Sequence, residues 1–227
     1  MTQASTAGST ACVALLGGSY DPVHTGHVSL GSYFSRLLQA DTLRVIPAGA
    51  PWQKGRLGAT CEQRAEMTRL AFSTLPLPVM IDLQEIERSE QGQPSYTIDT
   101  LRQVRAELGP TASIVFLMGA DQLQRLDTWR EWQQLFEYAH ICVAARPGFA
   151  LHGAAMPQAV AQEFTRRLGT LSSIRNTPHG LTYLAQDFAV DISATEIRAA
   201  LQRGFPANEL VSPLVLDYIE QHNLYKS

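Results

Sequence analysis

The sequence has no excess of basic residues that would suggest a polyanionic partner. Its 227 residues carry 18 Lys and Arg against 21 Asp and Glu, a formal net charge of -3 with both signs mixed along the chain. No basic tail or patch therefore argues for DNA, RNA or an anionic membrane as a partner. Any phosphate that the protein handles should be held locally, by a few placed groups.

Cysteine is scarce, and no secretory or membrane-spanning segment is evident. Cys12, Cys61 and Cys142 are widely spaced and form no CxxC or Cys/His metal pattern, which favours buried free thiols in a reducing compartment. Residues 1–11 lack the positive region and apolar run of a secretory signal, and the apolar stretch 12–16 is too short to cross a bilayer. We expect a cytoplasmic protein with a disordered leader at 1–11.

Apolar strands alternate with helical segments along the rest of the chain. This alternation predicts a doubly wound α/β fold, a Rossmann-like parallel sheet with helices on both faces. No repeat or low-complexity linker marks a boundary, so residues 12–227 are predicted to form a single domain. Strands are expected at 12–16, 43–46, 79–83, 113–118, 140–144 and within 181–190. Helical structure is expected at 27–38, 61–74, 98–108, 121–136, 194–202 and 213–222, with at most one helix, near 158–168, in the irregular stretch 147–180.

The segment GGSYDPVHTGH at residues 17–27 leaves the first predicted strand and enters a helix. It should therefore lie at the carboxyl edge of the sheet, where open α/β folds bind ligands. Gly17 and Gly18 allow close approach of a ligand, and the helix N-terminus offers N–H groups to phosphate. The segment is neither a Walker A loop nor a GxGxxG fingerprint, because the GK[ST] ending and the three-glycine spacing are absent.

His24 and His27 are three residues apart in this segment. On an opening helical turn they would project to one side, where both could contact one phosphate chain. The alternatives are satisfied polar side chains at a chance spacing, or a metal pair that lacks a third ligand. The surrounding glycines and Asp21-Pro22 weigh against a purely structural turn.

The segment resembles the GGxFDPxHxGH pattern of the nucleotidyltransferases that include the nicotinate mononucleotide adenylyltransferases, with Tyr20 in place of the more usual Phe. A second segment, ISATEIR at 192–198, is similar to the family's SxTxIR motif. Taken alone, it predicts a helix start with a capping box between Ser193 and Glu196. The resemblance implies an ATP site, in which Arg198 stabilises charge as pyrophosphate leaves. The implied ATP-binding residues are Gly17, Gly18, Ser19, Tyr20, Asp21, Gly119, Asp121, Ser193 and Thr195.

Two further segments resemble the nicotinate branch of this family: PSYTIDTL at 94–101, and GADQL at 119–123 with Trp129 beyond it. Asp121 should stand at the sheet edge and accept hydrogen bonds from a ribose, the alternative being a cap on the next helix. Trp129 offers a flat face to the cationic pyridinium ring, the alternative being a core or interface Trp. Tyr96 and Thr97, near a helix start, would direct N–H and hydroxyl donors at the nicotinate carboxylate, which an amide could not match.

The loop PAGAPWQK at 47–54 matches the family's lysine-bearing loop. It makes Lys54 a catalytic candidate, with Gln53 where many members carry His; a solvated surface Lys is the alternative. Arg146 is a weaker candidate for contact with the acceptor phosphate.

The resemblance implies that ATP and nicotinate mononucleotide give nicotinate adenine dinucleotide and pyrophosphate. The acceptor phosphate would attack the α-phosphorus in line, without a protein general base, because its second pKa is about 6. Catalysis then reduces to positioning and charge stabilisation by His24, His27, Lys54, Arg198 and one Mg²⁺ carried mainly by the triphosphate. The rivals are transfer to nicotinamide mononucleotide or phosphopantetheine, a CTP-using relative, a non-catalytic nucleotide-binding regulator and a structural protein. A homo-oligomer is compatible with the sequence.

Overall fold

Parallel strands form the centre of the fold. The computed structural model describes residues 11–49, 57–145, 148–188, 192–205 and 207–226. Within these ranges a 6-stranded parallel sheet has the order β3-β2-β1-β4-β5-β6. The strands are β1 (Cys12–Gly18), β2 (Thr42–Pro47), β3 (Val79–Ile81), β4 (Ser113–Gly119), β5 (His140–Ala144) and β6 (Thr182–Ala185). The chain winds from β1 out to β3, returns to β4 beside β1, and then winds out to β6, which confirms the predicted doubly wound sheet.

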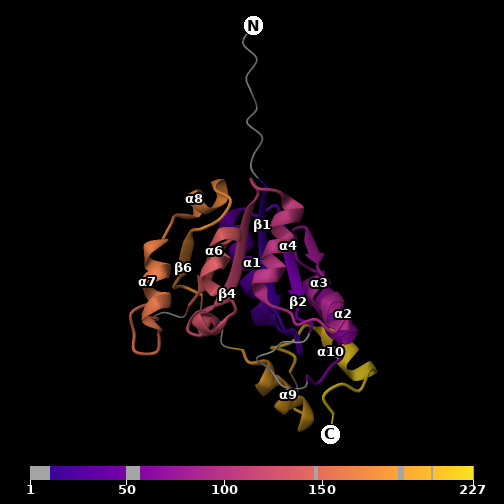
Figure 1. The fold of residues 1–227 in the computed structure, drawn as a ribbon. Coiled ribbons are helices and arrows are strands. Elements are labelled where there is room, and N and C mark those ends of the chain that lie inside the picture. Colours follow the sequence, from indigo (N-terminus) through magenta and orange to yellow (C-terminus); the bar gives the residue numbers. More distant parts are fainter. Residues whose placement is uncertain (1–10, 50–56, 146–147, 189–191, 206, 227) are drawn as a thin grey trace.

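Helices surround the sheet (Figure 1). They are α1 (Thr25–Leu38), α2 (Cys61–Phe72), α3 (Gln84–Glu90), α4 (Thr97–Leu108), α5 (Ala120–Leu123), the 3₁₀ helices η1 (Leu126–Thr128) and η2 (Trp132–Gln134), α6 (Leu135–Tyr138), α7 (Gln158–Arg166), α8 (Leu171–Asn176), α9 (Ala194–Gln202) and α10 (Pro213–Gln221). Apolar residues of α1, α2, α8, α9 and α10 pack against one face of the sheet, and those of α4, α6 and α7 pack against the other. Both faces are thus covered, as the near-continuous apolar strands require.

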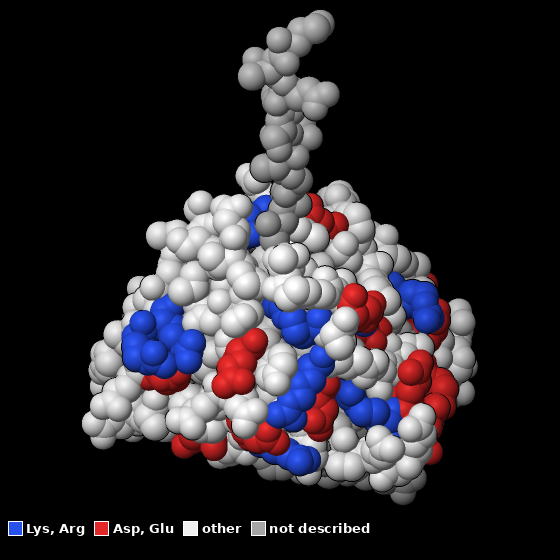
Figure 2. Space-filling view, turned by 45° about the horizontal axis from the view of Figure 1, so that its top comes forward, with Lys and Arg blue, Asp and Glu red and all other residues white. Residues whose placement is uncertain are grey.

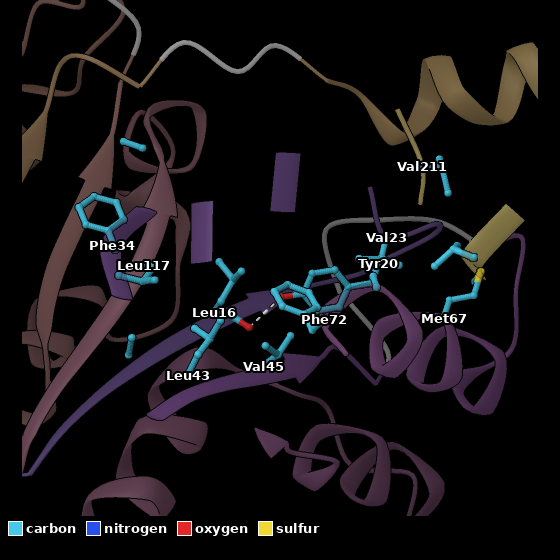
Figure 3. Close-up of a cluster of buried hydrophobic side chains, with 14 of the residues drawn as sticks. Leu16, Tyr20, Val23, Phe34, Leu43, Val45, Met67, Phe72, Leu117 and Val211 are labelled. Atoms are coloured by element: carbon cyan, nitrogen blue, oxygen red, sulfur yellow. Dashed lines mark hydrogen bonds between the residues drawn. The ribbon is translucent and has the colours of Figure 1, made fainter. Parts of the chain in front are cut away.

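Successive residues of β1 contribute to opposite halves of the core. Cys12, Ala14 and Leu16 lie in one buried cluster, and Val13 and Leu15 in the other. This is the period of two expected for a strand that is buried on both faces. Figure 3 shows the first cluster, where Leu16 and Leu43 of adjacent strands lie near the rings of Tyr20 and Phe72.

The structure corrects two sequence-based expectations. The stretch 147–180 contains two helices, α7 and α8, although at most one was predicted. Helix α8 is short and has one buried apolar residue, Ile174, so it carries little periodic signal; Thr170 caps it by accepting the Ser173 N–H at 3.1 Å. Helix α3 is not expected from the sequence, because it is short and largely charged and its one apolar residue, the buried Ile86, gives no periodic pattern.

Charged side chains of both signs lie interspersed on the face shown in Figure 2. One ion-pair group extends into the interior, where Arg44 of β2 contacts Asp82 at 2.6 Å and Glu107 at 2.7 Å. None of the described helices combines the length and the apolar character that a membrane span requires.

Candidate active site

A cavity of about 1130 Å³ opens at the carboxyl end of the sheet, where β1 and β4 end side by side. The chain leaves these two strands toward opposite edges of the sheet, so the cavity lies at the topological switch point, where open α/β folds bind ligands. Residues from both predicted phosphate motifs and from the predicted acceptor segments line it. Gly17 and Gly18 of β1 and Gly119 of β4 line it at the strand ends.

Tyr20 anchors the turn that follows β1. Its ring is fully buried and its hydroxyl donates to the Leu16 carbonyl at 2.8 Å, while its backbone takes a left-handed conformation with φ of 48° (Figure 3). A Cβ at Gly18 would lie 2.8 Å from this ring, so glycine is required there. Ser19 lines the cavity, and its carbonyl accepts from Arg64 Nη1 at 2.7 Å. Tyr20 therefore supports the loop that follows β1 from inside the core.

His24 and His27 stand together at the start of α1. His24 is the N-cap residue, and its N–H donates to His27 Nδ1 at 3.2 Å. The two imidazole rings are stacked, with centroids 3.6 Å apart, and the Tyr20 and His27 rings meet edge to face with centroids 4.9 Å apart. Both histidines line the cavity, so they project to one side as their spacing predicts.

Asp21 connects the first motif to two distant parts of the chain. Its carboxylate, in a residue that is 2% exposed, accepts from the Gly58 N–H at 2.8 Å and the Ala59 N–H at 3.1 Å. It also accepts from the Tyr225 hydroxyl at 2.7 Å. Its backbone carbonyl accepts from Arg198 Nη1 at 2.6 Å. Asp21 therefore holds the surroundings of the site together; its carboxylate is engaged within the protein.

Arg198 brings the second motif to the first. Besides its bond to the Asp21 carbonyl, its Nη2 donates to Thr195 Oγ1 at 3.3 Å, and its guanidinium lies 3.9 Å from the Asp21 carboxylate. The side chain is 31% exposed and lines the cavity. A cation held by two hydrogen bonds thus lines the same cavity as the paired histidines.

The predicted capping box at the start of α9 is wrong. The helix begins at Ala194, and Ser193 is its N-cap residue as expected, but its side chain makes no capping hydrogen bond. Ser193 and Thr195 line the cavity instead, and Glu196 is exposed. The Ser193 hydroxyl, which the sequence predicts to cap α9, therefore lies at the wall of the cavity.

Tyr96, Thr97 and Trp129 line another part of the same cavity. Tyr96 is the N-cap residue of α4 and Thr97 its first residue, so this helix also begins at the cavity. The half-buried Trp129 contacts Phe116 edge to face at a centroid distance of 6.1 Å, so it packs against the core as well as facing the cavity. Its Nε1 is buried and has no hydrogen-bond partner within the described ranges.

Asp121 lies in the first turn of α5, at the carboxyl end of β4. It is exposed and lines the cavity, and the N-cap residue of α5 is Gly119, not Asp121. Its Oδ2 accepts from Gln122 Nε2 at 3.0 Å. Asp121 thus stands at the predicted sheet edge, with no capping bond to the following helix.

Sequence reasoning missed several cavity residues, among them Arg130 and Glu85. Arg130 places its guanidinium over the Tyr96 ring, 4.8 Å from the centroid, beside Trp129. Glu85 of α3 accepts from the Thr100 hydroxyl at 2.7 Å, and burial raises the pKa of its carboxyl. Neither belongs to a short motif; the position of Arg130 directly after Trp129 was the one available signal. The candidates Lys54 and Arg146, with Gln53, lie outside the described residues.

No dedicated metal cage is found in the part of the chain that the structure describes, where no group of three or more His, Cys, Asp or Glu side chains could hold a metal ion. The nearby Asp21 carboxylate already accepts three protein hydrogen bonds. These residues suit a magnesium ion that arrives on a triphosphate and keeps its waters better than one held by protein carboxylates.

Comparison with protein families identifies relatives that match nearly the whole chain. The cytidylyltransferase-like family model matches residues 15–200. A protein of Herminiimonas arsenicoxydans named "Probable nicotinate-nucleotide adenylyltransferase" is 65% identical over 220 residues, which cover 96% of this chain and 98% of that protein. A protein of Dechloromonas aromatica with the same name is 39% identical, covering 95% of this chain and 98% of the relative.

Solved structures share the fold. The nicotinic acid mononucleotide adenylyltransferase of Plasmodium falciparum, complexed with NaAD, superposes with a TM-score of 0.71 at 19% identity, covering 95% of this chain and 97% of that chain. A nicotinate-nucleotide adenylyltransferase described as putative, from Vibrio parahaemolyticus, gives a TM-score of 0.60 at 16% identity, covering 95% of this chain and 96% of that one. At these identities the likeness establishes the α/β architecture.

Proposed function

This chain belongs to the nicotinate-nucleotide adenylyltransferase family, and we propose that it joins ATP to nicotinate mononucleotide, with release of pyrophosphate, through the residues of the cavity described above. One observation carries this assignment of residues: the first turns of α1 and α9 line the same cavity. His24 and His27 come from the start of α1 and Arg198 from α9, and Arg198 is bonded to the Asp21 carbonyl. The product would be nicotinate adenine dinucleotide, a precursor of NAD.

The triphosphate end of the cavity is assigned to the first and second motifs. Gly17, Gly18 and Ser19 leave the strand end open to a ligand, and the first turn of α1, where Gly26 lines the cavity, adds the positive end of the helix dipole. Ser193 and Thr195 add hydroxyls from the start of α9. Together with Arg198, these groups allow a protein of net charge -3 to bind a polyanion locally.

Catalysis in this proposal is positioning and charge stabilisation. The acceptor phosphate, ionised with a second pKa of about 6, attacks the α-phosphorus and displaces pyrophosphate. His24 and His27 donate hydrogen bonds to the phosphate oxygens on which charge develops, while Arg198 and the candidate Lys54 neutralise the leaving pyrophosphate. Mg²⁺ enters as part of the substrate, MgATP, and lowers the charge of the triphosphate.

The acceptor end is assigned to Tyr96, Thr97 and Trp129. The N-terminus of α4 begins at Thr97 and can donate N–H groups to the nicotinate carboxylate, an anion favoured at that end of a helix. Trp129 presents a ring face to the pyridinium, and Asp121 an acceptor to a ribose. We place the reaction in the cytoplasm, which suits the free thiols of Cys12, Cys61 and Cys142.

The decisive measurement is pyrophosphate release by the purified protein with MgATP, with nicotinate or nicotinamide mononucleotide at matched concentrations. We expect a strong preference for the acid. Comparable rates with the two acceptors would support adenylyl transfer but refute the proposal that α4 selects the nicotinate carboxylate. Release with neither would direct attention to phosphopantetheine and other acceptors, and then to a non-catalytic nucleotide sensor.

A further inference from the structure

Tyr225, close to the C-terminus, reaches back into the first motif. Its hydroxyl donates to Asp21 Oδ1 at 2.7 Å, and the residue is 7% exposed. Burial raises the pKa of Tyr225, and the hydrogen bond to Asp21 raises it further, so the hydroxyl stays protonated and remains a donor. The ring packs against Gly58, where an added Cβ would lie 2.8 Å from Tyr225 Cε1. Tyr225 therefore contacts both the buried Asp21 carboxylate and Gly58, whose N–H donates to that carboxylate. Figure 1 shows the C-terminus on the same side of the molecule as α9 and α10.

Asp21 links this tyrosine to Arg198. Oδ1 of Asp21 accepts from Tyr225 and from the Ala59 N–H, and Oδ2 accepts from the Gly58 N–H. Oδ2 is also 3.9 Å from Arg198 Nη1, which is beyond hydrogen-bond distance. The carboxylate is thus satisfied by neutral donors and leaves the Arg198 guanidinium, bonded to the Asp21 carbonyl, at the cavity wall.

Loss of the tyrosine hydroxyl would change this balance. Oδ1 would keep only the Ala59 N–H, at 3.1 Å, in a site that is 2% exposed. A buried carboxylate short of donors is costly, and the cation 3.9 Å away is the group that can compensate it. The carboxylate would then draw Arg198 into a direct ion pair and away from a ligand in the cavity.

We propose that Tyr225 is a positioning residue for ATP, which acts through Asp21 to keep the Arg198 guanidinium available to the triphosphate. The inference rests on the proposed function in naming ATP as the anion. It gives the C-terminal segment a role in the site, although none of the described residues of that segment lines the cavity.

The test is Tyr225→Phe in the full chain, which removes one oxygen and keeps the ring over Gly58. We expect the Kd of MgATP, measured by titration calorimetry, and its KM to rise about tenfold, the size expected when a hydrogen bond to a charged group is lost. The KM for nicotinate mononucleotide should change by less than about twofold, because Asp21 and Arg198 belong to the end of the cavity that the proposal assigns to the triphosphate. A merely structural role would lower the active fraction and leave both KM values as they are.

Tyr218→Phe is the matched control, since Tyr218 of α10 stacks on His222 and does not line the cavity. Gly58→Ala is the second variant: its Cβ would displace the Tyr225 ring, and it should weaken MgATP in the same direction. Unchanged MgATP affinity in folded Tyr225→Phe would overturn the proposal, as would a wild-type protein that binds no MgATP. Weaker MgATP binding by Tyr225→Phe in a protein that releases no pyrophosphate would support the positioning role and refute the proposed reaction.

Discussion

Replacing Asp21 by Asn tests whether the buried carboxylate ties the loop that follows β1 to the rest of the fold. The change is nearly isosteric, so it alters hydrogen bonding with little effect on packing. The amide retains one acceptor oxygen, which can take the place of Oδ1 and keep the Ala59 N–H and the Tyr225 hydroxyl. Its NH₂ group then faces the Gly58 N–H, a donor against a donor.

The magnitude follows from these contacts. One buried N–H without an acceptor costs about 1–3 kcal/mol, and each of the two remaining bonds loses about 1 kcal/mol of charge assistance. Burying an amide costs less than burying a carboxylate, which offsets part of the loss. We expect Asp21→Asn to lower the free energy of unfolding by about 3 kcal/mol, and the Tm by about 6–12 °C for a domain of this size.

Thermal and urea unfolding followed by circular dichroism would measure this change. Asp217→Asn is the matched control, because Asp217 is exposed on α10 and should shift stability by less than about 0.5 kcal/mol. If Asp21→Asn unfolds at the temperature of the wild type, the carboxylate contacts contribute nothing to stability and the reasoning is refuted.

Two further predictions concern histidines. His24→Ala should lower kcat by about 10²–10³-fold, the cost of removing a preorganised transition-state donor, while the KM for ATP changes little; His222→Ala, at an exposed position, is the control, and an unchanged kcat would rule the role out. Burial lowers the pKa of His140 to about 4, and its neutral ring accepts from the Leu181 N–H at 3.0 Å and donates to the Thr177 carbonyl at 2.8 Å. Below the unfolded pKa of about 6.5 only the unfolded chain takes up this proton, so the free energy of unfolding should fall as the pH drops from about 6.5 to about 4. His140→Gln should remove that part of the slope in pH-dependent urea unfolding; an identical slope in the variant would contradict it.

The sheet and most of its helices could be predicted from the sequence because they depend on local patterns. Strands buried on both faces appear as short apolar runs, and the segment 113–118 is the clearest of them. The limits of β5 match the expected ones, and α9 has the predicted bounds. Helices α3 and α8 could not be predicted, because each buries a single apolar residue and their stability depends on the neighbours they pack against.

The sequence by itself determined the residue types of the candidate site: glycines at a strand end, two histidines one turn apart, and an arginine shortly after a helix start. The spacing of residues within such motifs is local, so it can be recognised in the sequence without knowledge of the fold. Only the tertiary structure decided which of these groups meet. It placed the Arg198 guanidinium on the Asp21 carbonyl, left the Ser193 side chain at the cavity wall without its predicted capping bond, and brought the Tyr225 hydroxyl to a carboxylate 204 residues earlier in the chain. The physical reason is that a buried polar group must be satisfied by whatever donors the folded chain brings near it, and those donors come from segments whose sequence carries no mark of the contact.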